Sequence, residues 1–251
     1  WDEAVQEITA SLQPLGTEYC DQLEAGLRGR WCDRYPNVGK QSGAFSSGTY
    51  DSDPYILMNF QEDVIEHVFT LAHEAGHSMH TRLSADAQPF QYAGYTIFVA
   101  EVASTFNEQL LTRHLLSKAH SPKQRAAIIS REIDAIRGTI IRQTMFAEFE
   151  RMSHSSVESG EPLTLEKIRT IYRELLTAYF GSGFAIDEAL ELESLRIPHF
   201  YRAFYVYKYA TGLSASIALS KRVTEGGPKE LAAYLQFLRG GCSKWPLDLL
   251  R

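Results

Sequence analysis

The sequence predicts a mainly α-helical protein with a small antiparallel β-sheet near residues 42–60. From about residue 62 onward, apolar residues recur with helical spacing through most of the chain. Residues 30–60 differ, because they are rich in Gly, Ser and aromatic residues and carry turn signals such as Asp53 followed by Pro54. Within them, GAFS and PYILMNF are typical of two short strands joined by a turn.

Proline and glycine mark the ends of most expected helices. Residues 1–29 are expected to form a helix or a helical pair, interrupted near Pro14 and Gly16. The sequence contains no internal repeat, low-complexity segment or linker, so residues 1–251 are predicted to form a single domain. The further expected helices cover residues 63–83, 96–116, 122–152, 162–180, 198–223 and 228–239.

Composition and charge limit the classes of function that the chain can have. Hydrophobic residues make up 44% of the chain and charged residues 22%, which is ordinary for a globular protein. The net charge of −6 argues against nucleic-acid binding, and no apolar run is long enough to span a membrane. Cys20, Cys32 and Cys242 are too few and too far apart for a disulfide framework, which predicts a reducing, cytoplasmic location.

The stretch TLAHEAGHSMH contains two histidines four residues apart, with a glutamate directly after the first. On a helix, His73 and His77 share one face and can direct their rings at one ion. Glu74 is rotated by roughly 100° and can instead reach a water held on a metal. The pattern arises by chance in roughly one such chain in fifty, so it needs a further ligand to be convincing.

Glu101 is the candidate third ligand. It lies in the middle of an apolar stretch of an expected helix, where a carboxylate is costly to bury unless it is paired or binds a cation. Glu108 follows seven residues later on nearly the same face, where it could accept a hydrogen bond from a ligand histidine. Exposure to solvent is the alternative for both, and for Glu108 the sequence leaves the two readings open.

With Glu101 included, FTLAHEAGHSMHT and YTIFVAEVASTFNEQLL resemble the oligoendopeptidase F family of zinc metallopeptidases, which is related to thimet oligopeptidase. GKQSGAFSSGTYDSDPYILMNF and IPHFYRAFYVYKYATG are similar to the same family, so the resemblance covers nearly the whole chain. It implies a zincin-like helical catalytic domain. It also implies one Zn²⁺ held by His73, His77 and Glu101, with Glu74 as the general base in the hydrolysis of short peptides.

The resemblance also implies that a histidine and tyrosines of PHFYRAFYVYKYATG bind the substrate and the oxyanion. His199 and Tyr205 match best, followed by Tyr209, and spacing alone does not decide between the tyrosines. Tyr201, Tyr205 and Tyr209 recur every four residues, which predicts one stripe along a helix. On a helix starting at Pro198, His199 would lie roughly 120° away from Tyr205.

Two further expectations concern substrate and completeness. Gly43 and Ala44 are candidates for pairing with an extended substrate, although a glycine-rich turn explains GAFS equally well. Members of the family are about twice as long, and their additional N-terminal helical half forms the opposite wall of a peptide channel. The chain is therefore expected to be a catalytic fragment whose missing half, or a separate chain, completes the channel. The alternative is a zinc- and peptide-binding fragment that is inactive without that half.

Overall fold

The computed structural model describes residues 1–251, which group into two compact units. The first unit holds residues 1–130 and 212–251, and the second holds residues 131–211. Each unit has a hydrophobic core of its own. That residues 1–251 form one catalytic domain stays a prediction.

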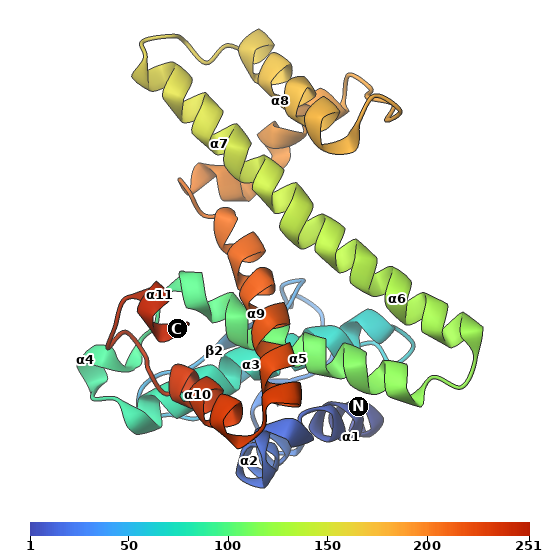
Figure 1. The fold of residues 1–251 in the computed structure, drawn as a ribbon, viewed down its shortest axis with the longest axis vertical. Coiled ribbons are helices and arrows are strands. Elements are labelled where there is room, and N and C mark those ends of the chain that lie inside the picture. The colour runs from blue at the N-terminus through green and yellow to red at the C-terminus, as the bar shows by residue number, and fades with distance from the viewer. The chain divides into compact units, whose positions relative to one another are not determined.

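The predicted mainly helical class is confirmed, and Figure 1 shows the course of the chain. Two helices run through the boundary between the units, namely α6 (Pro122–Ile136) and α9 (Tyr207–Gly226). The other helical elements of the first unit are α1 (Asp2–Ser11), the 3₁₀ turn η1 (Gln13–Leu15), α2 (Thr17–Arg28), α3 (Ile65–Ala87), α4 (Phe90–Ala93), α5 (Ile97–Lys118), α10 (Pro228–Leu238) and α11 (Pro246–Leu249).

The small sheet has three strands, β1 (Cys32–Asp33), β2 (Phe45–Ser47) and β3 (Tyr55–Leu57), in the order β1-β3-β2. The predicted antiparallel pair is present as β2 and β3, with Ser46 opposite Ile56. However, β1 joins β3 in parallel, so the sheet is mixed and not purely antiparallel. The two residues of β1 are too few for an alternating pattern, and the pairing depends on a distant partner.

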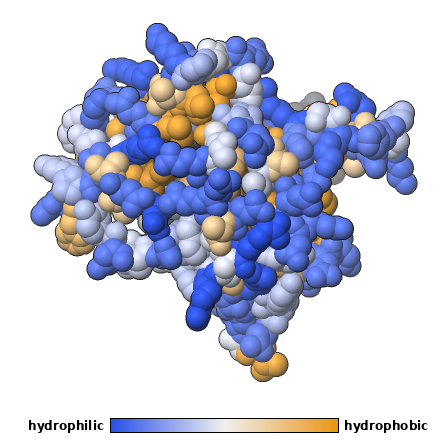
Figure 2. Space-filling model, turned by 90° about the horizontal axis from the view of Figure 1, so that it is seen from below, coloured by the Kyte–Doolittle hydropathy of each residue, from blue (hydrophilic) through white to orange (hydrophobic).

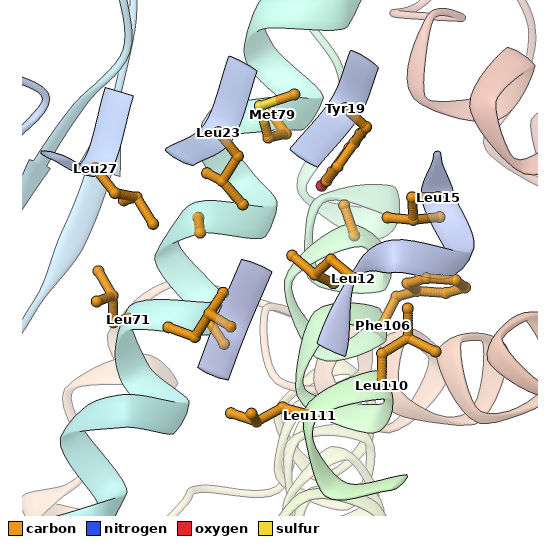
Figure 3. Close-up of a cluster of buried hydrophobic side chains, with 14 of the residues drawn as sticks. Leu12, Leu15, Tyr19, Leu23, Leu27, Leu71, Met79, Phe106, Leu110 and Leu111 are labelled. Carbon is orange, nitrogen blue, oxygen red and sulfur yellow. The ribbon is translucent and has the colours of Figure 1, made fainter. Parts of the chain in front are cut away.

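The core of the first unit lies between the N-terminal helices and the pair α3 and α5, as Figure 3 shows. Burying a large aliphatic or aromatic side chain contributes about 1.5–3 kcal/mol, so this layer fixes both helices firmly. The buried side chains that meet there are Leu12, Leu15, Tyr19, Leu23, Leu27, Leu71, Met79, Phe106, Leu110 and Leu111.

The second unit is built on α7 (Arg142–Glu158) and α8 (Leu165–Phe180). Between α6 and α7 lies a π-helical turn, η2 (Arg137–Ile141), so the long helix predicted from residue 122 runs through to Glu158. The 3₁₀ segments η3 (Leu190–Arg196) and η4 (Pro198–Tyr201) follow α8. The core of the second unit is formed by buried side chains, namely Met145, Phe146, Phe149, Ile171, Tyr172, Leu175, Leu176, Ile197 and Val206.

The predicted continuous helix over residues 198–223 is wrong in its first part. After η4 the backbone bends through residues 202–206, and α9 begins only at Tyr207. Phe204 has a φ of 56°, in the left-handed region that non-glycine residues rarely adopt. The aromatic stripe predicted along one helix is therefore divided between two elements and a bend.

Polar and charged residues cover most of the face seen in Figure 2, and apolar residues gather there in limited areas. None of the helices combines the length and the apolar character that crossing a membrane requires. All three cysteines are free thiols.

Candidate active site

The two histidines of HEAGH lie one turn apart on α3, where the structure places them side by side. Their ring centroids are 4.9 Å apart and the ring planes are inclined by 80°. The side chains are partly shielded from solvent, with exposed fractions of 25% for His73 and 19% for His77. This is the same-face arrangement that the spacing of four residues predicts.

Glu101 reaches both histidines from α5. Its Oε2 lies 3.3 Å from His73 Nε2 and 3.8 Å from His77 Nε2. One ligand atom from each of the three residues lies within 4.8 Å of the other two. Tetrahedral zinc with bonds of about 2.0–2.2 Å separates its ligands by about 3.4 Å, so these two nitrogens and one oxygen fit such an ion.

A glycine lets α5 approach α3 closely enough for this. A Cβ added at Gly76 would lie 2.6 Å from both the Ala103 carbonyl oxygen and Ser104 Cα, so a larger residue would push the helices apart. One turn earlier on α3, the Ala72 carbonyl accepts a hydrogen bond of 3.1 Å from Asn107 Nδ2. The close contact of α3 with α5 thus fixes where the carboxylates of α5 lie relative to His73 and His77.

Glu101, His73 and His77 lie close enough to shift one another's pKa values. Burial alone would raise the pKa of Glu101, but hydrogen bonding to His73 and the charges of both histidines hold it below its ordinary value. Burial would lower the pKa of His73, but Glu101 and Glu108 outweigh it and raise the pKa to about 10. Burial and the neighbouring charge of His73 lower the pKa of His77 to about 4. Clusters of this kind are common at functional sites.

Glu108 lies behind His73. Its Oε1 is 2.8 Å from His73 Nδ1, on the side of the ring opposite Glu101. The Glu108 side chain is 19% exposed, so the structure places it beside His73 and not in open solvent. Such a carboxylate orients an imidazole and selects the tautomer whose other nitrogen is free to bind a cation.

Glu74 is a buried carboxylate between α3 and the sheet. It is 7% exposed, and burial raises the pKa of its carboxyl. The backbone N–H of Ser46 in β2 donates to it. The Ser46 hydroxyl also lies 2.8 Å from the Ser78 hydroxyl, one turn further along α3. The strand and the helix are therefore joined at the residue that the sequence predicts as the base.

The strand β2 is an edge of the sheet, and β3 is its one neighbour. The Ile56 N–H donates to the Trp31 carbonyl at 2.6 Å, so the polar groups of Ile56 face β1 and not β2. Ser46, directly opposite, accordingly turns its own backbone outward. Ala44, two residues earlier, is half-buried and immediately precedes β2. Gly43 is exposed with a φ of 94°, and its carbonyl accepts a hydrogen bond from Asn59.

In the second unit, the bend at residues 202–206 brings together groups that a continuous helix would separate. The His199 ring centroid lies 5.5 Å from that of Tyr205 and 5.9 Å from that of Tyr209. The Tyr209 hydroxyl lies 3.2 Å from His199 Nε2. Tyr201 turns elsewhere: it is 78% exposed, and its hydroxyl donates to the Leu195 carbonyl at 3.3 Å.

Several residues around His73, His77 and Glu101 were not predicted from the sequence. Gly212 of α9 abuts Glu101, because a Cβ added there would lie 2.8 Å from Glu101 Cβ. Ser104 Oγ lies 3.1 Å from Glu101 Oε2 and donates to it, and the Tyr95 hydroxyl donates to the His77 carbonyl at 3.3 Å. Of these contacts, only that of Ser104 could have been predicted from the sequence, because Ser104 follows Glu101 by three residues on the same helix.

His80 is the third histidine of the stretch TLAHEAGHSMH. It is 1% exposed and stacks on Tyr95, with ring centroids 3.7 Å apart. Burial lowers its pKa to about 3. It belongs to the packing between α3 and its neighbours and is absent from the group of potential ligands.

Comparison with known proteins adds a second line of evidence. Oligopeptidase PepF of Bacillus subtilis is 47% identical over 251 residues, which are all of this chain and 37% of the relative. An oligoendopeptidase F homolog of Borreliella burgdorferi is 45% identical over 251 residues, or 42% of its own length. The chain thus spans about two fifths of the length of these curated relatives.

Solved structures agree with this picture. A crystal structure of oligoendopeptidase-F from Enterococcus faecium matches 99% of this chain and 37% of its own, with a TM-score of 0.71 and 33% identity. A peptidase candidate from Chlamydophila abortus matches 99% of this chain and 42% of its own, with a TM-score of 0.87 and 44% identity. The sequence profile of peptidase family M3 matches residues 6–251 of this chain. The chain belongs to peptidase family M3.

Proposed function

We propose that residues 1–251 are the catalytic portion of a zinc-dependent endopeptidase that hydrolyses short peptides. The observation that supports this most directly is the convergence of His73, His77 and Glu101 on one point. The relatives named above are oligopeptidases, so a peptide substrate accords with the family. The free cysteines accord with a cytoplasmic location.

His73 Nε2, His77 Nε2 and Glu101 Oε2 would hold the ion, because imidazole nitrogen and carboxylate oxygen are usual zinc donors. When bound, zinc supplies Lewis acidity, lowering the pKa of a coordinated water toward about 7 and polarising a peptide carbonyl. The pairing of His73 Nδ1 with Glu108 keeps the other ring nitrogen turned toward Glu101. Related metals of similar charge suit the same donors.

Glu74 would act as the general base, accepting a proton from the attacking water and passing it to the leaving amine. Its raised pKa suits both transfers, since a base works best when its pKa is near the working pH. The Ser46 N–H holds one side of the carboxylate and so limits its rotation.

The outer edge of β2 would bind the substrate as an added antiparallel strand. Ala44 lies two residues before Ser46, so its backbone groups fall on the same outward side, whereas the Gly43 carbonyl is already engaged by Asn59. His199, Tyr205 and Tyr209 would contribute an imidazole and hydroxyl donors to the substrate and the oxyanion. Tyr201 is less suited, because it points away from that group.

One alternative function has an observation in its favour. Because the chain spans about two fifths of its relatives, a zinc- and peptide-binding fragment that needs a further half for turnover is the second candidate. A purified chain loaded with zinc and given a quenched-fluorescence oligopeptide distinguishes the two. Cleavage by the parent and not by Glu74→Gln supports the endopeptidase.

Absence of cleavage by both proteins, with one zinc bound per chain, supports the binding fragment. If neither protein binds zinc, both candidates fail. Glu74→Gln is the suitable control, because glutamine keeps the shape of the side chain and removes the proton acceptor.

A further inference from the structure

Glu150 on α7 is a buried carboxylate outside the proposed catalytic groups. It is 3% exposed, although a carboxylate is costly to bury without compensation. Its Oε1 accepts a hydrogen bond of 2.8 Å from the backbone N–H of Phe204. The Val206 backbone donates as well, and His154 and Lys208 add positive charge nearby. The compensation therefore comes chiefly from backbone groups of a segment more than fifty residues away in the sequence.

Those backbone groups belong to the bend that precedes α9. The first N–H groups of a helix have no partner within it, and its positive dipole end favours a carboxylate. Glu150 thus accepts from the backbone just before α9, on the side of the helix end whose dipole favours a carboxylate. Phe204 needs such support, because its φ of 56° is rare for a residue with a side chain. Its ring also packs on His154, with centroids 4.6 Å apart.

The same bend determines the neighbours of His199. On a continuous helix, residues six positions apart point roughly 120° away from each other, so His199 and Tyr205 would not meet. In the structure the two rings are 5.5 Å apart, and the Tyr209 hydroxyl lies 3.2 Å from His199 Nε2. Tyr205 and Tyr209 are also neighbours, with ring centroids 5.8 Å apart.

We propose that Glu150 is a positioning residue, which holds the bend at residues 202–206 and so assembles His199, Tyr205 and Tyr209 into one group. The proposal rests on the proposed function in that these three side chains are assigned to the substrate. Glu150 is hydrogen-bonded to the backbone of the bend and makes no hydrogen bond to His199, Tyr205 or Tyr209. A carboxylate that merely stabilised the packing of α7 would lower stability when removed but would leave the environment of His199 unchanged.

NMR of the chain with ¹³C-labelled histidine tests this directly. The His199 ring signals are assigned by their loss in His199→Gln. In Glu150→Ala they are expected to shift and to lose the signature of the bond with Tyr209, while circular dichroism retains the helical content. Glu150→Gln keeps an acceptor oxygen and should shift them less. Glu148→Gln is the matched control, because Glu148 lies on the same helix and bonds Tyr179 instead, so the His199 signals should stay in place.

A second readout uses the zinc-loaded chain and the fluorogenic peptide. Glu150→Ala is expected to keep its zinc and to lose about tenfold or more in kcat/KM, as misplacement of a positioned group does, and Glu150→Gln to lose less. If Glu150→Ala keeps the parent's His199 signals, the proposal is overturned. If Glu150→Ala does not fold, the His199 signals of Glu150→Gln decide in the same way. A parent that neither binds zinc nor cleaves peptide contradicts the proposed function, while the NMR comparison still decides the role of Glu150.

Discussion

Glu108 Oε1 and His73 Nδ1 lie 2.8 Å apart, on the side of the ring away from Glu101. The two carboxylates of α5 therefore bracket one imidazole, one at each ring nitrogen. The helical repeat explains the pairing, because residues seven apart return to nearly the same face after two turns. A proton held on Nδ1 leaves Nε2 free as an electron-pair donor.

Replacing Glu108 by Ala should therefore weaken metal binding by about 10–100-fold, in the range found when the partner of a ligand histidine is removed. Glu108→Gln should lose less, because its amide oxygen can still accept from Nδ1. Competition with a chromophoric chelator measures the affinity. The exposed Glu18 provides the control, and Glu18→Ala should bind zinc like the parent. Equal affinities for Glu108→Ala and the parent would contradict this role.

Gly212 should matter for the same site through packing. Its added Cβ would lie 2.8 Å from Glu101 Cβ and 3.4 Å from the Glu101 carbonyl carbon, so Gly212→Ala must displace Glu101 or α9. We expect a loss of stability of about 1–3 kcal/mol, as for other overpacked sites, and weaker zinc binding. Thermal unfolding and chelator competition measure the two effects.

The matched control is Gly138→Ala, because a Cβ at Gly138 meets nothing within 4 Å. Alanine there should leave zinc affinity unchanged. If Gly212→Ala binds zinc as tightly as Gly138→Ala, the contact of Gly212 with Glu101 does not position the ligand.

Glu7 predicts a pH dependence of stability in the first unit. Its partial burial would raise the pKa, but hydrogen bonds from Lys118 and His114 outweigh this and hold the pKa below its ordinary value of 4.5. A carboxyl with a lowered folded pKa stabilises the fold above its unfolded pKa, and this contribution is lost as the pH falls through the folded pKa.

The melting temperature of the parent should therefore exceed that of Glu7→Gln at pH 7, and the difference should shrink below about pH 4.5. Because Glu7 is partly exposed, the contribution at pH 7 should be under about 1 kcal/mol. Melting curves of both proteins at several pH values measure it. A difference that grows toward acid pH would contradict the assignment.

The sequence was sufficient for the parts of the site that depend on local spacing. Two histidines four apart, and a glutamate isolated among apolar residues, give their geometry once a helix is assumed. Proline and glycine likewise marked the ends of α8 and α10 to within a few residues. The spacing of site residues and the residues at helix ends both act within one or two turns of a helix, so they can be read without knowing the fold.

Features that depend on distant partners were beyond the sequence. The parallel pairing of β1 requires Trp31 to meet Ile56, and the bend at residues 202–206 requires Glu150 to accept from Phe204. Spacing alone favours a continuous helix there, because the aromatic residues recur every four positions. A buried carboxylate on another helix overrides that local preference by satisfying the backbone N–H groups of the bend.

The zinc content of the purified chain tests the central claim most directly. After equilibration with zinc and removal of the excess, the parent should retain one zinc per chain, and His77→Ala should retain little, because two donors are left of the three that converge. Equal zinc content in the parent and His77→Ala would contradict the assignment of His73, His77 and Glu101 as the metal site.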